Sequence, residues 1–154
     1  KIEDQELIVN FLDVMENHKM LVENSGLLTV AALKHLKCKG KKVVSILSGG
    51  NMDIITLSSV VQHGLIERGR VFTVSVLLPD RPGELVNVAN VIAEMKGNVI
   101  KLEHNQFVSI NRNAAVELTI TMEAFGKEHK KQIIDALKKK GYDPKPENPT
   151  SLYQ

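Results

Sequence analysis

Two short segments of the chain carry residue types and spacings that could hold a small molecule. The first is Ser48-Gly49-Gly50-Asn51, which follows the apolar run 43–47 and precedes a helix-compatible stretch from about residue 52. Glycines let a ligand approach the backbone, and a serine hydroxyl can donate or accept a hydrogen bond. The segment is neither a Walker loop nor a G-x-G-x-x-G sequence. Spacing alone therefore leaves two interpretations, a ligand-binding turn or a tight connection.

The second segment is Asp80-Arg81-Pro82-Gly83, within "PDRPGEL". Pro82 and Gly83 favour a helix start, and Asp80 is a candidate cap for that helix. The free N–H groups and positive end of a helix attract an anion such as a carboxylate. Asn98, at the start of the next expected strand, could reach the same pocket or could serve as a turn residue. The alternative is that the segment simply starts a helix.

No other cluster of residues indicates chemistry. The five histidines show no metal-ligand spacing with cysteine or with each other, so we assign no metal site. No serine, histidine and aspartate arrangement can be singled out, and no lysine stands out as a Schiff-base nucleophile. We therefore expect no catalytic residue in this chain. The histidines are His18, His35, His63, His104 and His129.

The first part of the chain has one buried-type strand among helices. Apolar periodicity predicts helices over residues 3–17, 26–38 and 54–68. The run 43–47 is nearly all apolar, which is typical of a strand buried in a parallel sheet. A single buried strand has no ladder partner for its backbone. We therefore expect residues 1–68 to be the tail of a larger α/β domain, or to pair with another chain.

The second part of the chain has a different pattern, with four expected strands, of which the last is short, and two expected helices. The order β-α-β-β-α-β predicts the ferredoxin-like arrangement. The expected strands are 71–78, 97–107, 114–123 and 142–146, the helices are 83–95 and 126–141, and a loop lies at 109–113.

The two outer strands of this sheet differ in how they are protected. Pro144 and Pro146 remove N–H donors on one side of the last strand, so it must lie at a sheet edge. Strand 97–107 is the other edge and contains no proline. An unprotected edge invites pairing with a second copy. The alternative is that Lys101 and Glu103 act as gatekeepers and keep this edge single.

Composition excludes several classes of protein. The chain has 154 residues, of which 43% are hydrophobic and 25% charged, so it is a globular chain. A net charge of +2 and six aromatic residues without tryptophan argue against nucleic acid as a partner. No apolar run approaches the ~20 residues of a membrane span. The single cysteine, Cys38, allows no internal disulfide and fits a cytoplasmic location.

Three quoted segments carry a family resemblance: "VENSGLLTVAAL", "VVSILSGGNMD" and "PDRPGEL". With them, residues 18–68 resemble the C-terminal part of threonine dehydratase (threonine ammonia-lyase), a pyridoxal-phosphate enzyme of fold type II. Residues 71–147 resemble an ACT regulatory domain. The resemblance implies an α/β fragment of the catalytic domain at 1–69, an α+β ferredoxin-like βαββαβ ACT domain at 70–148 and a tail at 149–154.

The resemblance also implies part of a cofactor site for pyridoxal 5'-phosphate. Ser48 matches the serine that hydrogen-bonds the pyridine nitrogen, and Gly49 and Gly50 would let the chain approach the ring. Glu23 matches the glutamate of an E-P-S-G-like segment, although Asn24 stands here in place of the proline. The Schiff-base lysine and the phosphate-binding loop of the family precede this region. We therefore expect this chain alone to be inactive and not to bind the cofactor.

For the second part, the resemblance implies an amino-acid effector such as isoleucine or valine. Residues Asp80, Arg81, Pro82, Gly83 and Asn98 match the usual binding positions. ACT domains pair side by side, which implies a homodimer or tetramer through strand 97–107. The intact enzyme would convert threonine to 2-oxobutanoate and ammonia. The alternative function is a stand-alone, non-catalytic amino-acid sensor in which residues 1–68 form a dimerising arm.

Overall fold

The computed structural model describes residues 1–105 and 115–147. The loop predicted at 109–113 and the tail predicted at 149–154 lie outside these residues. The chain divides into two compact units, Lys1–Glu67 and Arg68–Gln154. Within the described ranges, no helix is both long enough and apolar enough to cross a bilayer.

The N-terminal unit is built from three helices, which confirms the three predicted helices and shifts their ends slightly. They are α1 (Asp4–His18), α2 (Asn24–Ala32), which continues into a short 3-10 turn, η1 (Leu33–His35), and α3 (Ile54–Glu67). Helix α1 packs against both α2 and α3. Apolar residues from all three helices form one core, because each helix repeats them at helical spacing. The buried residues are Leu7, Phe11, Leu12, Val14, Val22, Leu27, Ala31 and Val60.

A side-chain hydrogen bond ties the first helix to the 3-10 turn. The Glu6 carboxylate lies 2.9 Å from His35 Nε2. This hydrogen bond lowers the pKa of Glu6 below its usual value. Both groups lie near the surface, so the pair aligns the two segments more than it stabilises the unit.

The strand predicted at 43–47 is wrong for this structure. Residues 36–53 contain no helix or strand beyond a turn. Val44 is 89% exposed and Ile46 is 74% exposed, although their side chains are apolar. The described residues of this unit supply no second strand, and a strand exists only through hydrogen bonds to a neighbour. The apolar composition is therefore that of a buried strand, while the local structure is an exposed connection.

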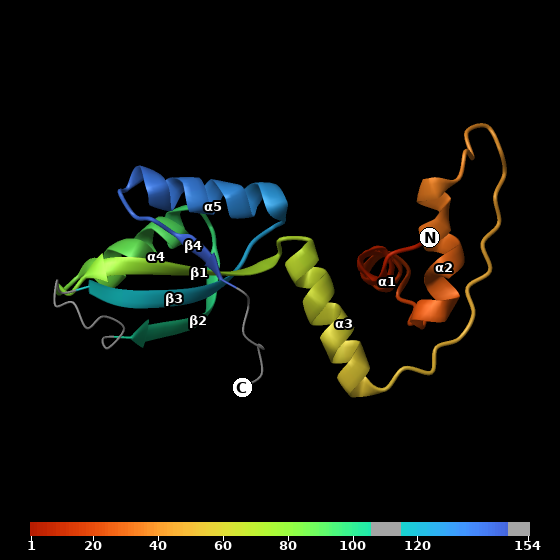
Figure 1. Ribbon diagram of the computed structural model, residues 1–154, viewed down its shortest axis with the longest axis horizontal. Coiled ribbons are helices and arrows are strands. Elements are labelled where there is room, and N and C mark those ends of the chain that lie inside the picture. The colour runs from red at the N-terminus through yellow and green to blue at the C-terminus, as the bar shows by residue number, and fades with distance from the viewer. Residues whose placement is uncertain (106–114, 148–154) are drawn as a thin grey trace. The chain divides into compact units, whose positions relative to one another are not determined.

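The C-terminal unit has the predicted order of strands and helices. Its elements are β1 (Val71–Pro79), α4 (Glu84–Glu94), β2 (Asn98–Asn105), β3 (Ala115–Glu123), α5 (Lys127–Lys139) and β4 (Lys145–Glu147). The strands form one antiparallel sheet in the order β2-β3-β1-β4. Both helices cover the same face of this sheet (Figure 1). The unit is thus a small α/β structure compatible with a ferredoxin-like domain.

Alternation along the central strands places one set of side chains under the helices. Phe72, Val74, Val76 and Leu78 of β1 are buried in the same core as residues of β3, α4 and α5. The intervening residues include Thr73, whose hydroxyl lies 2.9 Å from the hydroxyl of Thr121 on β3. Period-two patterning thus fixes which face of each strand meets the helices.

Both predicted edges of the sheet are confirmed by the strand order. Strand β4 is short and contains Pro146, as expected of an edge. It starts at Lys145, later than predicted, because the end of α5 turns through Gly141 and the Tyr142 N–H donates to the Leu137 carbonyl. Strand β2 is the opposite edge. It has a bulge between Val99 and Lys101.

Candidate functional site

The turn at Ser48-Gly49-Gly50 lies against the start of α2. The Glu23 N–H donates to the Gly49 carbonyl at 3.1 Å. Gly49 has φ +76°, in the left-handed region that favours glycine. The Glu23 carboxylate fills the space that a side chain on Gly49 would need. Sequence reasoning named Glu23 and the turn separately, and the structure brings them together.

Two further contacts hold the same turn in place. A Cβ on Gly26 would collide with the carbonyl oxygen of Ser48, so α2 and the turn meet backbone to backbone at this point. Earlier in the segment, the Thr29 hydroxyl donates to the Ile46 carbonyl at 3.1 Å. The turn is therefore positioned by α2 even though no strand precedes it.

A pocket of about 290 Å³ adjoins the turn. Glu23, Asn24 and Ser25 line one part of it, and the Ser25 hydroxyl donates to Glu23 Oε1 at 2.7 Å. Ser48 itself is exposed, and no described residue hydrogen-bonds its hydroxyl. The remaining lining residues are Asn51, Met52, Asp53 and Thr56.

Asp53 forms the polar start of α3 beside this pocket. Its Oδ1 accepts a hydrogen bond from the Thr56 N–H at 2.9 Å, and its Oδ2 accepts one from the Thr56 hydroxyl at 2.5 Å. These hydrogen bonds lower the pKa of Asp53 below its usual value. Sequence reasoning did not single out Asp53, although an aspartate three residues before a threonine at a helix start is a recognisable capping pattern.

In the C-terminal unit, Asp80, Arg81, Pro82 and Gly83 form the exposed connection from β1 to α4. The Arg81 N–H donates to the Pro79 carbonyl at 2.8 Å, which turns the chain sharply after β1. The prediction that Asp80 caps the helix is wrong, because Gly83 is the cap residue and α4 has no side-chain cap. Gly83 enters the helix at φ +94°. The Glu84 N–H donates to the Arg81 carbonyl at 3.4 Å, and the N–H groups of the next two residues have no side-chain cap and are open to a ligand or to water.

Asn98 does not meet this loop within one chain. Asn98 is in register with Glu123, and Glu123 is also in register with Val71 at the start of β1. The loop 80–83 instead follows the end of β1, at the opposite end of the sheet. The Asn98 side chain donates to Glu123 Oε2 at 2.8 Å.

Comparison with curated proteins finds relatives that match nearly the whole chain. An L-threonine ammonia-lyase of Geobacter sulfurreducens is 35% identical over 143 residues, which are 92% of this chain and 36% of that protein. An L-threonine ammonia-lyase of Thermotoga maritima is 30% identical with the same coverage. A biosynthetic L-threonine dehydratase of Pasteurella multocida is 26% identical over 146 residues, 92% of this chain and 27% of that protein. No family model matches the chain.

These alignments are too long to lie within one unit, so the similarity includes both the helical unit and the sheet unit. The chain spans about a third of the length of these two threonine ammonia-lyases. The chain therefore belongs to the threonine ammonia-lyase family and corresponds to the C-terminal part of those enzymes.

Proposed function

We propose that this chain supplies part of the cofactor site and the regulatory module of a threonine ammonia-lyase, which converts threonine to 2-oxobutanoate and ammonia. The observation that carries the proposal is the 35% identity over 92% of the chain to a protein named for that activity. The rest of the active site, including the Schiff-base lysine, would come from the part of the enzyme that precedes this region. The chain's own contribution is to position groups around the reaction and to sense an amino acid.

The turn at Ser48-Gly49-Gly50 suits the pyridine edge of pyridoxal 5'-phosphate. The Ser48 hydroxyl has no hydrogen-bond partner among the described residues, and no side chain on Gly49 or Gly50 blocks an approaching ring. When bound, the cofactor supplies an electron sink for elimination. A neutral hydroxyl at its ring nitrogen does not hold a proton there as an aspartate would. In this proposal Glu23 fixes the turn through the Gly49 carbonyl.

The C-terminal unit acts as an ACT domain in this proposal, with an effector site shared by two copies. Within one copy, Asn98 and the loop 80–83 lie at opposite ends of the sheet. If two β2 edges pair antiparallel, Asn98 of the second copy lies at the same end as the loop of the first. The pairing therefore unites residues that one chain keeps apart. The open N–H groups at the start of α4 then suit the carboxylate of an effector such as isoleucine or valine.

A thermal-shift titration of the chain with isoleucine, valine, threonine and serine tests the effector site. A ligand at 100 times its dissociation constant stabilises the folded state by about 2.7 kcal/mol. This corresponds to a rise in melting temperature of roughly 5–11 °C in a chain of this size. We expect such a rise with one aliphatic amino acid. We expect it to disappear in Gly83→Val, because a branched side chain at φ +94° forces the loop to change shape.

Gly40→Val is the matched control, since Gly40 also has a left-handed φ and open surroundings but lies in the other unit. It should leave the ligand-induced rise unchanged. A Gly83→Val variant that responds to the amino acid as strongly as the wild type would contradict the proposed site.

A further inference from the structure

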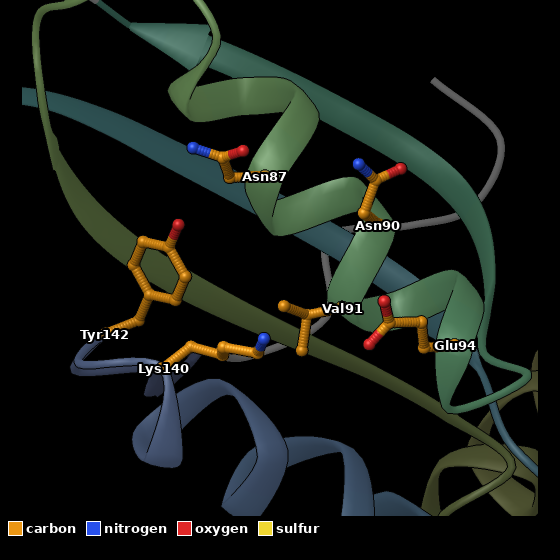
Figure 2. A pocket seen from close by; sticks show the side chains of 6 residues that line it. All are labelled: Asn87, Asn90, Val91, Glu94, Lys140 and Tyr142. Atoms are coloured by element: carbon orange, nitrogen blue, oxygen red, sulfur yellow. The ribbon is translucent and has the colours of Figure 1, made fainter.

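A second pocket in the C-terminal unit belongs to neither site described above. It lies between α4 and the connection from α5 to β4 and has a volume of about 320 Å³. Binding sites for small molecules range from about 300 to 1,000 Å³, so this one suits a molecule no larger than a single amino acid. Figure 2 shows its lining side chains, which are Asn87, Asn90, Val91, Glu94, Lys140 and Tyr142.

An apolar side chain and a fixed aromatic ring form the neutral part of this pocket. Val91 is 6% exposed and belongs to the core of the unit. Burial raises the pKa of Tyr142, and the Glu84 carboxylate beside it acts in the same direction. The phenol therefore stays neutral and hydrogen-bonded to Glu84, which holds the ring beside the pocket. The Tyr142 ring, with the small exposed part of Val91, offers an apolar surface for a small aliphatic group.

Two opposite charges border the same pocket without neutralising each other. Glu94 and Lys140 are both exposed, and neither makes an ion pair or a side-chain hydrogen bond within residues 1–105 and 115–147. In Figure 2 the Lys140 ammonium extends toward Val91 and Glu94, from the opposite side of the pocket. Each charged group is thus free to take a separate counter-charge from a ligand.

We propose that this pocket binds a free α-amino acid with a small aliphatic side chain. Its carboxylate faces Lys140, its ammonium faces Glu94, and its side chain lies against Val91 and Tyr142. A simple anion would be repelled by Glu94, and a simple amine would be repelled by Lys140. A zwitterion satisfies both charges at once, so the pair selects against ligands that carry only one. The Asn87 amide, on the Tyr142 side of the pocket, adds a polar group that can donate or accept.

A titration of the ¹⁵N-labelled chain, followed by NMR, tests the ligand class. The probes are L-valine, isobutyrate, which lacks the ammonium, and isobutylamine, which lacks the carboxylate. We expect saturable shifts of the Asn87, Val91 and Tyr142 amides with L-valine. Each one-charge analogue should bind about tenfold more weakly or worse, because a hydrogen bond to a charged group contributes about 1.5–3 kcal/mol. Equal binding of either analogue would overturn the proposal.

Variants distinguish this pocket from the proposed effector site at loop 80–83 and Asn98. Glu94→Gln and Lys140→Gln should each weaken L-valine about tenfold at these three amides. Lys139→Gln is the matched control, since Lys139 is exposed beside Lys140 but does not line the pocket, and it should bind as the wild type does. Gly83→Val should also keep these shifts. Shifts confined to residues 80–83 and 98, or no saturable shift at all, would overturn the proposal.

Discussion

At the scale of single residues, the candidate cofactor site depends on two glycines, because neither has a side chain to fill the space beside it. Gly49 leaves room for the Glu23 carboxylate, and Gly26 leaves room for the carbonyl of Ser48. At Gly26 the turn therefore meets α2 through backbone, which cannot move aside as the flexible Glu23 side chain at Gly49 can. A single methyl group at Gly26 would push the turn away from the helix.

Gly26→Ala tests this contact. Helix propensity alone favours alanine over glycine by about 1 kcal/mol. The clash with the Ser48 carbonyl should outweigh this gain, because overpacking costs about 1–3 kcal/mol. We expect a lower free energy of unfolding for the N-terminal unit, measured by urea denaturation followed by circular dichroism.

Gly64→Ala is the matched substitution, because Gly64 is also helical and buried but its nearest neighbours are side-chain atoms of Leu12 and Ile8 and not backbone. Its loss of stability should be clearly smaller. If Gly26→Ala proved as stable as the wild type, the turn would not be held against α2 in solution as the structure shows.

The sequence predicted the members of both proposed sites but only part of their geometry. The turn after residue 47 was chosen for its residue types and Glu23 through a family resemblance, and the structure joins them. For Asn98 and the loop 80–83, the strand order shows that they lie at opposite ends of one sheet. The pocket of Glu94 and Lys140 gave no local signal, because helix packing and not spacing along the chain brings the two residues together.

At the scale of the elements, the helices were predictable and the buried-type strand was not. A helix makes its hydrogen bonds within itself, so apolar periodicity is enough to locate α1, α3 and α5. A strand needs a neighbour, and the segment 43–47 has none among the described residues of its unit. The error therefore follows from the difference between local and non-local hydrogen bonding.

The start of α3 should respond to pH through Asp53. Hydrogen bonds from Thr56 lower the pKa of Asp53 below its usual value of 3.8. The stability that they contribute is therefore complete above about pH 4 and is lost as the pH falls through the lowered pKa. We expect Asp53→Ala to be less stable than the wild type at neutral pH, in urea denaturation of the chain.

This difference should shrink steadily as the pH falls below about 4. Asp53→Asn keeps an acceptor at the cap but cannot titrate, so it should show a weaker pH dependence than the wild type in the same range. A gap between wild type and Asp53→Ala that stays constant down to about pH 2.5 would rule out this role for the carboxylate.

At the scale of the whole molecule, each unit has its own core, and association depends on one edge of the sheet. Strand β4 is blunted by proline, whereas β2 contains no proline and is protected by the Lys101–Glu103 ion pair and its bulge. That pair, at 2.8 Å, neutralises the charge that would otherwise keep a second copy away. We therefore expect the chain to form a dimer through β2.

Light scattering coupled to size-exclusion chromatography measures this association. Ile100 lies at the bulge of β2 and is 41% exposed, so Ile100→Lys adds an unpaired charge to the edge. We expect this substitution to raise the dissociation constant of the dimer at least about tenfold. Leu77→Lys, an exposed residue of the central strand β1, is the control and should remain dimeric. A wild type that stays monomeric at high micromolar concentration would refute the dimer.

The exposed run at 43–47 has a consequence for how this chain behaves in concentrated solution. The five residues carry no charge, no proline and no glycine, three of them are β-branched, and the side chains of Val44 and Ile46 face water. Such a run can stack with identical runs of other molecules into intermolecular cross-β structure. Lys41 and Lys42 directly precede it and act as gatekeepers through their mutual repulsion. Solubility of the chain should therefore fall with added salt, which screens those two charges while leaving the apolar side chains unchanged.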